Sequence, residues 1–498
     1  MHKFNIEIIC FLMGVLLLFN GGFMLLSSLL SLLTNDGVTQ EISMAAMLTL
    51  LVGFLMVLIS RKHTKQLHKR EGYLVVTFGW LMMSLSGTLP YLFTGVFSDF
   101  TSAFFETMSG YTTTGSSVLT DIESIPKGIL FWRSMTHWIG GMGIIVLAIA
   151  ILPLLGIGGM QLFTAEAPGP SSDKLHPRIT DTAKRLWYIY VGFTLTETFL
   201  LWVAGMSFFD AINHAMSTVS TGGFSTKNAS MAYWNDQPLI QYITIFFMFI
   251  AGINFVLSYF AFTGQVKRIF LDEEFRFYRR MIFCCTLVVT LILMNKVDIT
   301  QSSFAHPQIY GQLESSFRHA LFQIIAVITT TGFVTADFTS WTPFLTLLFF
   351  GLMFMGGSAG STSGGVKGVR HFLMIKSGIL EFKRALHPNA VLQIRYNSAV
   401  VQENVTQNIY GFFILYMIAF IVGALVFSFI GLDFTTSIGV AASSLGNVGP
   451  ALGEFGPAFS FAEMPMLGKW WATFLMLIGR LELFTVLIIL TPFFWRKV

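Results

Sequence analysis

Four short polar segments, each containing a glycine, recur along an otherwise apolar chain. They read Tyr-Thr-Thr-Thr-Gly-Ser-Ser, Val-Ser-Thr-Gly-Gly-Phe, Thr-Thr-Thr-Gly-Phe and Ser-Ser-Leu-Gly-Asn, and they align on Gly115, Gly222, Gly332 and Gly446. The intervals between these glycines are 107, 110 and 114 residues, and a period this regular indicates an internal repeat. Rings of backbone carbonyl oxygens can replace the hydration shell of a cation. We therefore predict that the four segments form four parts of one pore lining, supplied by a single chain.

The glycine segments need elements that bring them to one place inside a membrane. Each follows a stretch of roughly 10–14 residues, which is too short to cross a bilayer as a helix. These stretches begin at residues that cap helices well, namely Asp99, Asp210, Ser315 or Ser316, and Asp433. We expect half-length pore helices whose C-terminal ends, with their partial negative charge, point at the pore. The non-helical backbone beyond them is tolerated at that depth only where it is buried in protein or faces water.

Close packing of helices is the competing interpretation of these motifs. Small residues such as glycine and threonine let transmembrane helices approach one another, and for any single motif this explanation is the stronger. Four motifs at near-constant spacing, each after a capped half-length helix and before a full span, favour the pore lining.

Composition places the whole chain in a lipid bilayer. Of its 498 residues, 54% are hydrophobic and 11% are charged, whereas a soluble protein carries about 25% charged residues. Most of the 30 Lys and Arg residues lie at the termini or within 61–70, 174–185, 267–280 and 367–395. By the positive-inside rule these segments and both termini are cytoplasmic, which requires an even number of crossings. The three cysteines do not suggest a disulfide framework or a metal site.

The order of apolar runs predicts an all-α polytopic membrane protein with ten crossings. An N-terminal two-helix hairpin precedes four pseudo-repeated helix–pore-helix–helix units around a single central ion pore. The boundaries that we expect are 1–70 for the hairpin, 71–170 for unit 1, 171–270 for unit 2, 271–395 for unit 3 and 396–498 for unit 4. The last spans of units 2 and 4 are expected to be continuous over 240–262 and 470–492.

A run of ten small residues interrupts the last span of unit 3. It comprises Gly356, Gly357, Ser358, Ala359, Gly360, Ser361, Thr362, Ser363, Gly364 and Gly365. Such composition is typical of a flexible surface linker. A nucleotide-binding loop is disfavoured because Lys367 is followed by glycine and no strand precedes the run. At ~1.5 Å per residue from Trp341, the break lies ~22 Å into the span, which favours an intramembrane loop across the pore.

Arg480 is a charged residue within the last apolar span, about 16 Å past Lys469 at the rise of a helix. A charge at that depth costs ~2.5–3.5 kcal/mol on insertion scales, so it should face water or a partner. A structural pair with Glu482 or Glu197 is the alternative to a position in the pore. Glu482 is the weaker partner because two residues apart on a helix do not share a face.

With these features the chain resembles the Trk/Ktr/HKT superfamily of potassium transporters, and within it the TrkH/TrkG type of bacterial inner-membrane subunit. The resemblance covers essentially the whole length, including the linker Pro168–Leu186 with its His-Pro-Arg-Ile-Thr-Asp-Thr-Ala order. The N-terminal hairpin is a feature of the TrkH type. Glycine at all four filter positions implies K⁺, because in this superfamily a serine at the first is associated with sodium permeation. The fourth motif is the most divergent.

The resemblance implies roles for these residues and for partners. K⁺ would bind at backbone carbonyls of Thr113, Thr114, Gly115, Ser220, Thr221, Gly222, Thr330, Thr331, Gly332, Ser444, Leu445, Gly446 and Asn447. The small-residue loop and Arg480 would form the gate. A homodimer, a cytosolic nucleotide-binding ring subunit of the TrkA type, and no covalently bound cofactor or nucleic acid are expected. The basic loops that would bind the ring serve equally well as topology signals.

Rival functions and supporting residues complete the expectations. A proton- or sodium-coupled potassium symporter, with Glu197 or Glu482 carrying the proton, remains open. An intramembrane enzyme would need a nucleophile and a base at matching depth, and the sequence shows no such pair. Arg133 is expected to be a structural anchor, while Glu106 and His214 are expected to hydrogen-bond behind the filter.

Overall fold

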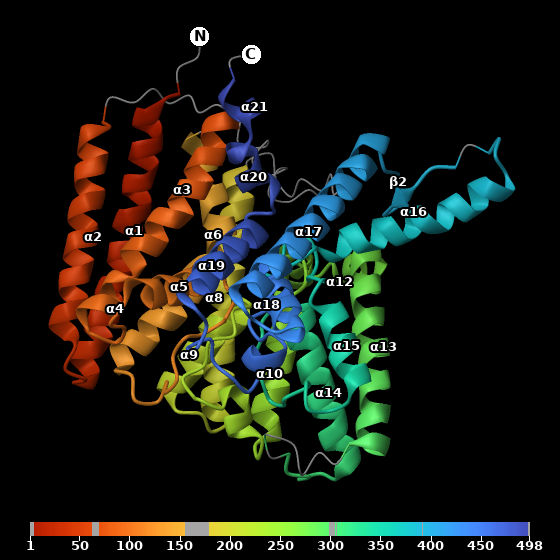
Figure 1. Cartoon of the computed structure of the whole chain (residues 1–498), viewed down its shortest axis with the longest axis horizontal. Coiled ribbons are helices and arrows are strands. Elements are labelled where there is room, and N and C mark those ends of the chain that lie inside the picture. The colour runs from red at the N-terminus through yellow and green to blue at the C-terminus, as the bar shows by residue number, and fades with distance from the viewer. Residues whose placement is uncertain are drawn as a thin grey trace.

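The computed structural model describes residues 4–61, 69–154, 179–297, 304, 306–390 and 392–496, and this part of the chain is almost entirely helical (Figure 1). Its only strands are the two-residue pair β1 (Arg395–Tyr396) and β2 (Ala399–Val400), which run antiparallel. The all-α class expected from the sequence is confirmed. The basic segment 62–68 and most of the linker 168–186 lie outside the described residues.

The helices are grouped by the boundaries expected for the hairpin and the four units, which stay a prediction. The hairpin is α1 (Ile6–Thr34) and α2 (Thr39–Ile59). Unit 1 contains α3 (Lys69–Gly87), α4 (Leu89–Phe93), α5 (Phe100–Tyr111) and α6 (Lys127–Leu154). Unit 2 contains α8 (Ile179–Val203), α9 (Phe208–Val219), the 3₁₀ turn η1 (Ser230–Trp234), α10 (Pro238–Ala251), α11 (Phe255–Phe262) and α12 (Val266–Leu271). Unit 3 contains α13 (Glu273–Lys296), α14 (Gln312–Ile328), α15 (Pro343–Leu352) and α16 (Gly368–Leu386). Unit 4 contains α17 (Glu403–Ile430), α18 (Phe434–Gly446), the 3₁₀ turn η2 (Gly453–Phe455), α19 (Met466–Arg480), α20 (Phe484–Leu490) and α21 (Pro492–Trp495).

The short helices α5, α9, α14 and α18 occupy the places of the four expected pore helices. Asp99 and Asp433 cap α5 and α18 as predicted, accepting hydrogen bonds from Ser102 N and from Thr435 N and Thr436 N. The other two caps differ from the prediction. α9 begins earlier, at the hydroxyl of Ser207, and α14 begins at Gly311 with no side-chain cap. Ser315 and Ser316 are instead buried inside α14, because the helix extends further towards its N-terminus than the half-length pattern suggested.

The last spans of units 2 and 4 are broken, which corrects the expectation of continuous helices. α10 and α11 meet at a bend of 108°, and α19 and α20 at 117°. Six described helices are individually long and apolar enough to cross a membrane, and counting each bent pair as one span raises this number to eight. Ten crossings would also require α6 and the interrupted α15–α16 pair, so the count of ten stays a prediction.

Two apolar clusters hold these helices together. One joins α1–α6 with α17–α20, through residues such as Trp80, Phe105 and Leu475, and the other joins α8–α10 with α13–α15. The two ends of the described chain lie at the same end of the molecule, where Phe4 stacks on Phe494 at 5.9 Å (Figure 1). This placement suits an even number of crossings.

Candidate functional site

The four short helices α5, α9, α14 and α18 end in the same unusual backbone conformation. The residues Thr113, Thr221, Thr330 and Asn447 all adopt the left-handed region, with φ of 52°, 55°, 56° and 54°. The next residue in each unit donates its N–H to a carbonyl five residues earlier, over 2.8–3.0 Å. This is a Schellman-type end, which normally places glycine where three threonines stand here. Left-handed non-glycine residues cost about 1–3 kcal/mol each and cluster at functional sites. All four are fully buried, so the surrounding packing maintains the strain.

A glycine with positive φ follows two residues after each of these positions. These glycines are Gly115, Gly223, Gly332 and Gly449, with φ of 84°, 84°, 72° and 102°. The sequence alignment on Gly222 and Gly446 is therefore out of register by one and three residues. Two adjacent glycines hid the shift in unit 2. In unit 4, Gly446 ends α18 and the equivalent glycine is Gly449.

The four glycines and the residues before them form a closed ring. A Cβ placed on Gly115 would collide with the carbonyl oxygen of Gly222, and one on Gly223 with that of Thr331. The cycle continues from Gly332 to Val448 O and returns from Gly449 to Thr114 O. Units 1 to 4 thus follow one another around a circle in chain order. A side chain at any of these glycines would displace the neighbouring unit's backbone.

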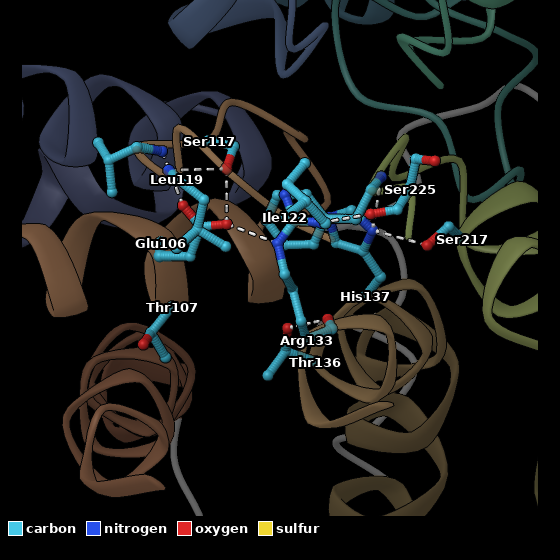
Figure 2. Close-up of polar contacts among 12 residues, drawn as sticks. Glu106, Thr107, Ser117, Leu119, Ile122, Arg133, Thr136, His137, Ser217 and Ser225 are labelled. Carbon is cyan, nitrogen blue, oxygen red and sulfur yellow. Dashed lines mark hydrogen bonds and ion pairs between the residues drawn. The ribbon is translucent and has the colours of Figure 1, made fainter. Parts of the chain in front are cut away.

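A buried ion pair within unit 1 lies beside the ring, and its arginine also contacts unit 2. Arg133 on α6 donates from Nε to Glu106 on α5 at 2.6 Å and from Nη1 to the carbonyl of Ser225 at 2.9 Å. Its guanidinium carbon also lies 3.5 Å from the centre of the Phe224 ring. Figure 2 shows the Glu106 carboxylate joined to both Arg133 and Ser117, and Glu106 also accepts from Val118 N at 2.9 Å. Arg133 is therefore an anchor, and Glu106 makes the hydrogen bonds expected of it.

Other polar contacts support the same region in units 2 and 3. His214 on α9 contacts the Ser225 hydroxyl at 2.9 Å. His137 on α6 stacks on Phe224 with ring centres 3.9 Å apart and leaves no space for a side chain on Gly222. In unit 3, His319 and Gln323 on α14 reach the Thr335 hydroxyl at 3.1 and 3.2 Å.

The loop 356–365 lies inside the protein, against the ends of the pore helices. Eight of its ten residues are buried, which excludes a flexible surface linker. Gly364 N donates to the Thr330 hydroxyl at 2.7 Å, and the Thr362 hydroxyl donates to Val219 O at 3.0 Å. The break between α10 and α11 accommodates the loop, because Ser358 N bonds to Gly252 O at 2.8 Å.

Charged side chains fasten the loop from three sides. Arg480 donates from Nη1 to Thr362 O at 2.7 Å, and from Nη2 to Gly140 O at 3.3 Å. The ammonium group of Lys367 donates to Ser363 O. Glu274 on α13 accepts from the N–H groups of Ala359 and Val369 at 2.8 and 2.9 Å. Ala359 lies in the loop and Val369 lies just after it, in α16, so Glu274 joins the loop to the helix that follows.

The carboxylates proposed as partners of Arg480 lie elsewhere. Glu482 pairs with Arg370 on α16 at 2.5 Å, and the described residues contain no ion pair between Arg480 and a carboxylate. Glu197 is fully buried on α8. Sequence reasoning missed Gly223, Val448 and Gly449 because threonine rarely adopts positive φ, so units 1 to 3 gave no signal of the turn. Asparagine is enriched at positive φ, and Asn447 was the one signal available.

Comparisons with known proteins agree with this architecture. The chain matches the family "TrkH: Cation transport protein" over residues 38–497. It is 40% identical over 489 residues to "Trk system potassium uptake protein TrkH" of Salmonella typhimurium, covering 98% of each chain, and 41% identical over 491 residues to the protein of the same name from Vibrio parahaemolyticus, again covering 98% of each. The crystal structure of the potassium transporter TrkH from Vibrio parahaemolyticus superposes with a TM-score of 0.87 at 38% identity, covering 99% of this chain and 100% of that one. The chain belongs to the TrkH family of cation transport proteins.

Proposed function

We propose that the protein takes up K⁺ across the bacterial inner membrane through the glycine ring. The observation that carries this proposal is the fourfold recurrence of one strained backbone conformation, closed into a ring by Gly115, Gly223, Gly332 and Gly449. Carbonyl oxygens in such a ring replace the hydration shell of K⁺. The C-terminal ends of four helices add partial negative charge around the cation. The relatives named as potassium uptake proteins support K⁺ as the ion.

The proposed filter keeps the predicted residues of units 1 and 3 and shifts in the other two. Thr113, Thr114 and Gly115 correspond to Thr221, Gly222 and Gly223 in unit 2 and to Thr330, Thr331 and Gly332 in unit 3. In unit 4 the corresponding residues are Asn447, Val448 and Gly449. Ser220, Ser444, Leu445 and Gly446 then belong to the helix ends that present the ring.

The loop 356–365 is the proposed gate, and Arg480 holds it closed. The loop contacts Thr330 of the proposed filter directly, and Arg480 binds its carbonyl at Thr362. The charge of Arg480 raises the energy of a cation passing below the ring. Opening therefore requires the loop to leave hydrogen bonds on several sides, which suits control by a partner.

The protein is expected to act as a homodimer that binds a cytosolic nucleotide-sensing ring. The relatives belong to a "Trk system", a name that indicates further components. The termini and basic segments would then face the cytoplasm.

Uptake of ⁸⁶Rb⁺ in a transport-deficient bacterium tests the proposal. The unaltered protein should restore uptake, and Gly115→Ser and Gly332→Ser should make that uptake more sensitive to Na⁺. Unchanged uptake and unchanged inhibition by Na⁺ in both variants would show that the ring is not the filter.

A further inference from the structure

One polar side chain stands out in the N-terminal hairpin, which contributes nothing to the ring. Asn20 lies within the 29-residue apolar helix α1 and is 1% exposed. Its amide nitrogen donates to the Ser86 hydroxyl at 2.8 Å and to Met83 O at 3.4 Å, both on α3. Its carbonyl oxygen accepts from the hydroxyl of Tyr111 at 2.5 Å. A polar side chain inside a membrane span is costly unless it is hydrogen-bonded, and asparagine there characteristically bonds across to neighbouring helices.

The residue that Asn20 binds adjoins the ring. Tyr111 is the last residue of α5, two positions before the strained Thr113 and four before Gly115. The other units have Val219, Ile328 and Leu445 at the same distance from their glycines. Only unit 1, against which the hairpin packs, has a hydroxyl at this position.

The fold makes room for this contact. Gly87, at the end of α3, packs against α5, and a Cβ there would come within 2.8 Å of the Tyr111 ring and 3.2 Å of its hydroxyl. The carbonyl of Gly87 accepts from the Trp132 indole nitrogen at 3.1 Å, which fixes the glycine against α6. The tyrosine side chain is fully buried, and its hydroxyl is held by Asn20.

We propose that the N-terminal hairpin positions the first quarter of the filter through the Asn20–Tyr111 hydrogen bond. This inference rests on the proposed function of the ring. Tyr111 starts the turn in which Thr113 adopts positive φ, and Thr114 O meets Gly449 across the boundary with unit 4. Loosening Tyr111 lets Thr114 O move relative to the other three oxygens, which weakens discrimination between K⁺ and Na⁺.

The test compares ion selectivity in Tyr111→Phe, Asn20→Leu and the double variant. Tyr111→Phe removes a single oxygen atom, so it preserves packing even if Asn20→Leu fails to fold. Thr49→Val is the matched control, because the Thr49 hydroxyl bonds only within the hairpin, to Ala45 O and the Met24 sulfur. Each protein is reconstituted, and ⁸⁶Rb⁺ uptake is measured against increasing Na⁺.

Each single variant should lose K⁺ preference by roughly 2- to 10-fold, which is the change that losing one net hydrogen bond would produce. The double variant should lose little more, because both substitutions remove the same bond. Thr49→Val should retain the original selectivity. Original selectivity in Tyr111→Phe, or losses that simply multiply in the double variant, would overturn the proposal. Gly115→Ser, measured in parallel, shows whether a negative result concerns the role of the hairpin or the filter assignment itself. If it changes selectivity while Tyr111→Phe does not, only the role of the hairpin is wrong, and if neither changes it, the filter assignment is wrong.

Discussion

Replacing Arg480 with alanine should increase K⁺ flux through the purified protein in the absence of any partner. The side chain binds the proposed gating loop through a charged hydrogen bond of 2.7 Å from Nη1 to Thr362 O. It is 4% exposed, so water does not compete for the carbonyl in this conformation. The second bond, to Gly140 O, is longer at 3.3 Å and fastens the arginine to α6 rather than to the loop.

The size of the effect follows from that bond. A hydrogen bond to a charged group contributes about 1.5–3 kcal/mol, and 1.4 kcal/mol is a factor of ten in an equilibrium constant. If the bond exists only in the closed state, losing it raises the ratio of open to closed loops by about 10- to 100-fold. Flux rises in proportion until most molecules are open. Removing the charge lowers the barrier to a cation further.

The assay is ⁸⁶Rb⁺ uptake into proteoliposomes without the regulatory ring. Arg480→Lys keeps the charge and an ammonium group that can donate to the loop, so it should conduct less than Arg480→Ala. Arg384→Ala is the control for loss of a cation, because Arg384 is an exposed residue of α16 whose partners are Glu381 and Leu392 O. Shortening the loop should also raise flux, and combining it with Arg480→Ala should add little, because both changes open one barrier. Reduced transport in both Arg480→Ala and the shortened-loop variant, with unaltered melting temperature and particle size, would refute the assignment of the loop as the gate.

Four further predictions concern the ring, its support, the partner and coupling. Gly223→Ala should weaken K⁺ preference in ⁸⁶Rb⁺ uptake, because the added Cβ would collide with Thr331 O. Gly351→Ala is the control, since no atom lies within 4 Å of a Cβ there, and it should keep the original preference. Equal selectivity in both variants would contradict the corrected register. Glu106→Gln should destabilise the protein by about 3–5 kcal/mol in thermal unfolding, because it leaves the buried Arg133 charge without its partner. Adding Arg133→Met removes that charge and should recover part of the lost stability. A double variant as unstable as the single one would contradict this account of the ion pair. Purification with a co-expressed nucleotide-binding ring should yield a dimer bound to the ring, and a monomer that does not retain it would exclude the proposed assembly. The reversal potential should not follow a pH gradient, whereas a shift with pH would favour proton coupling.

The sequence predicted the elements of the pore better than their register. Asp99 and Asp433 cap their helices because capping depends on local chemistry that the sequence displays. The shift from Gly222 to Gly223 was hidden because either glycine satisfies the same motif, and only backbone angles distinguish them.

The helix breaks were not predictable from apolar patterning. Gly252–Asn254 follows an apolar run, and the chain bends there where Gly252 O accepts from Ser358 N of the loop 356–365. The second bend, at Leu481–Leu483, contains the charged Glu482, which pairs with Arg370 on α16. Glu482 and Leu483 even adopt positive φ, a conformation that tertiary packing imposes against local preference. The hydrogen bond between Asn20 and Tyr111 joins residues 91 positions apart, and a lone amide in an apolar helix was the available signal.

The closed ring of four glycines has a consequence for how ion preference can change over evolution. In a pore assembled from four identical chains, one codon change introduces four methyl groups at the same level, which closes the aperture or leaves it intact. Here each glycine is encoded separately, so one substitution alters a single sector and leaves the other three carbonyl contacts in place. In the proposed filter, selectivity can therefore shift in small steps, and unit 4, with Asn447 and Val448 beside its glycine, differs in sequence from the other three.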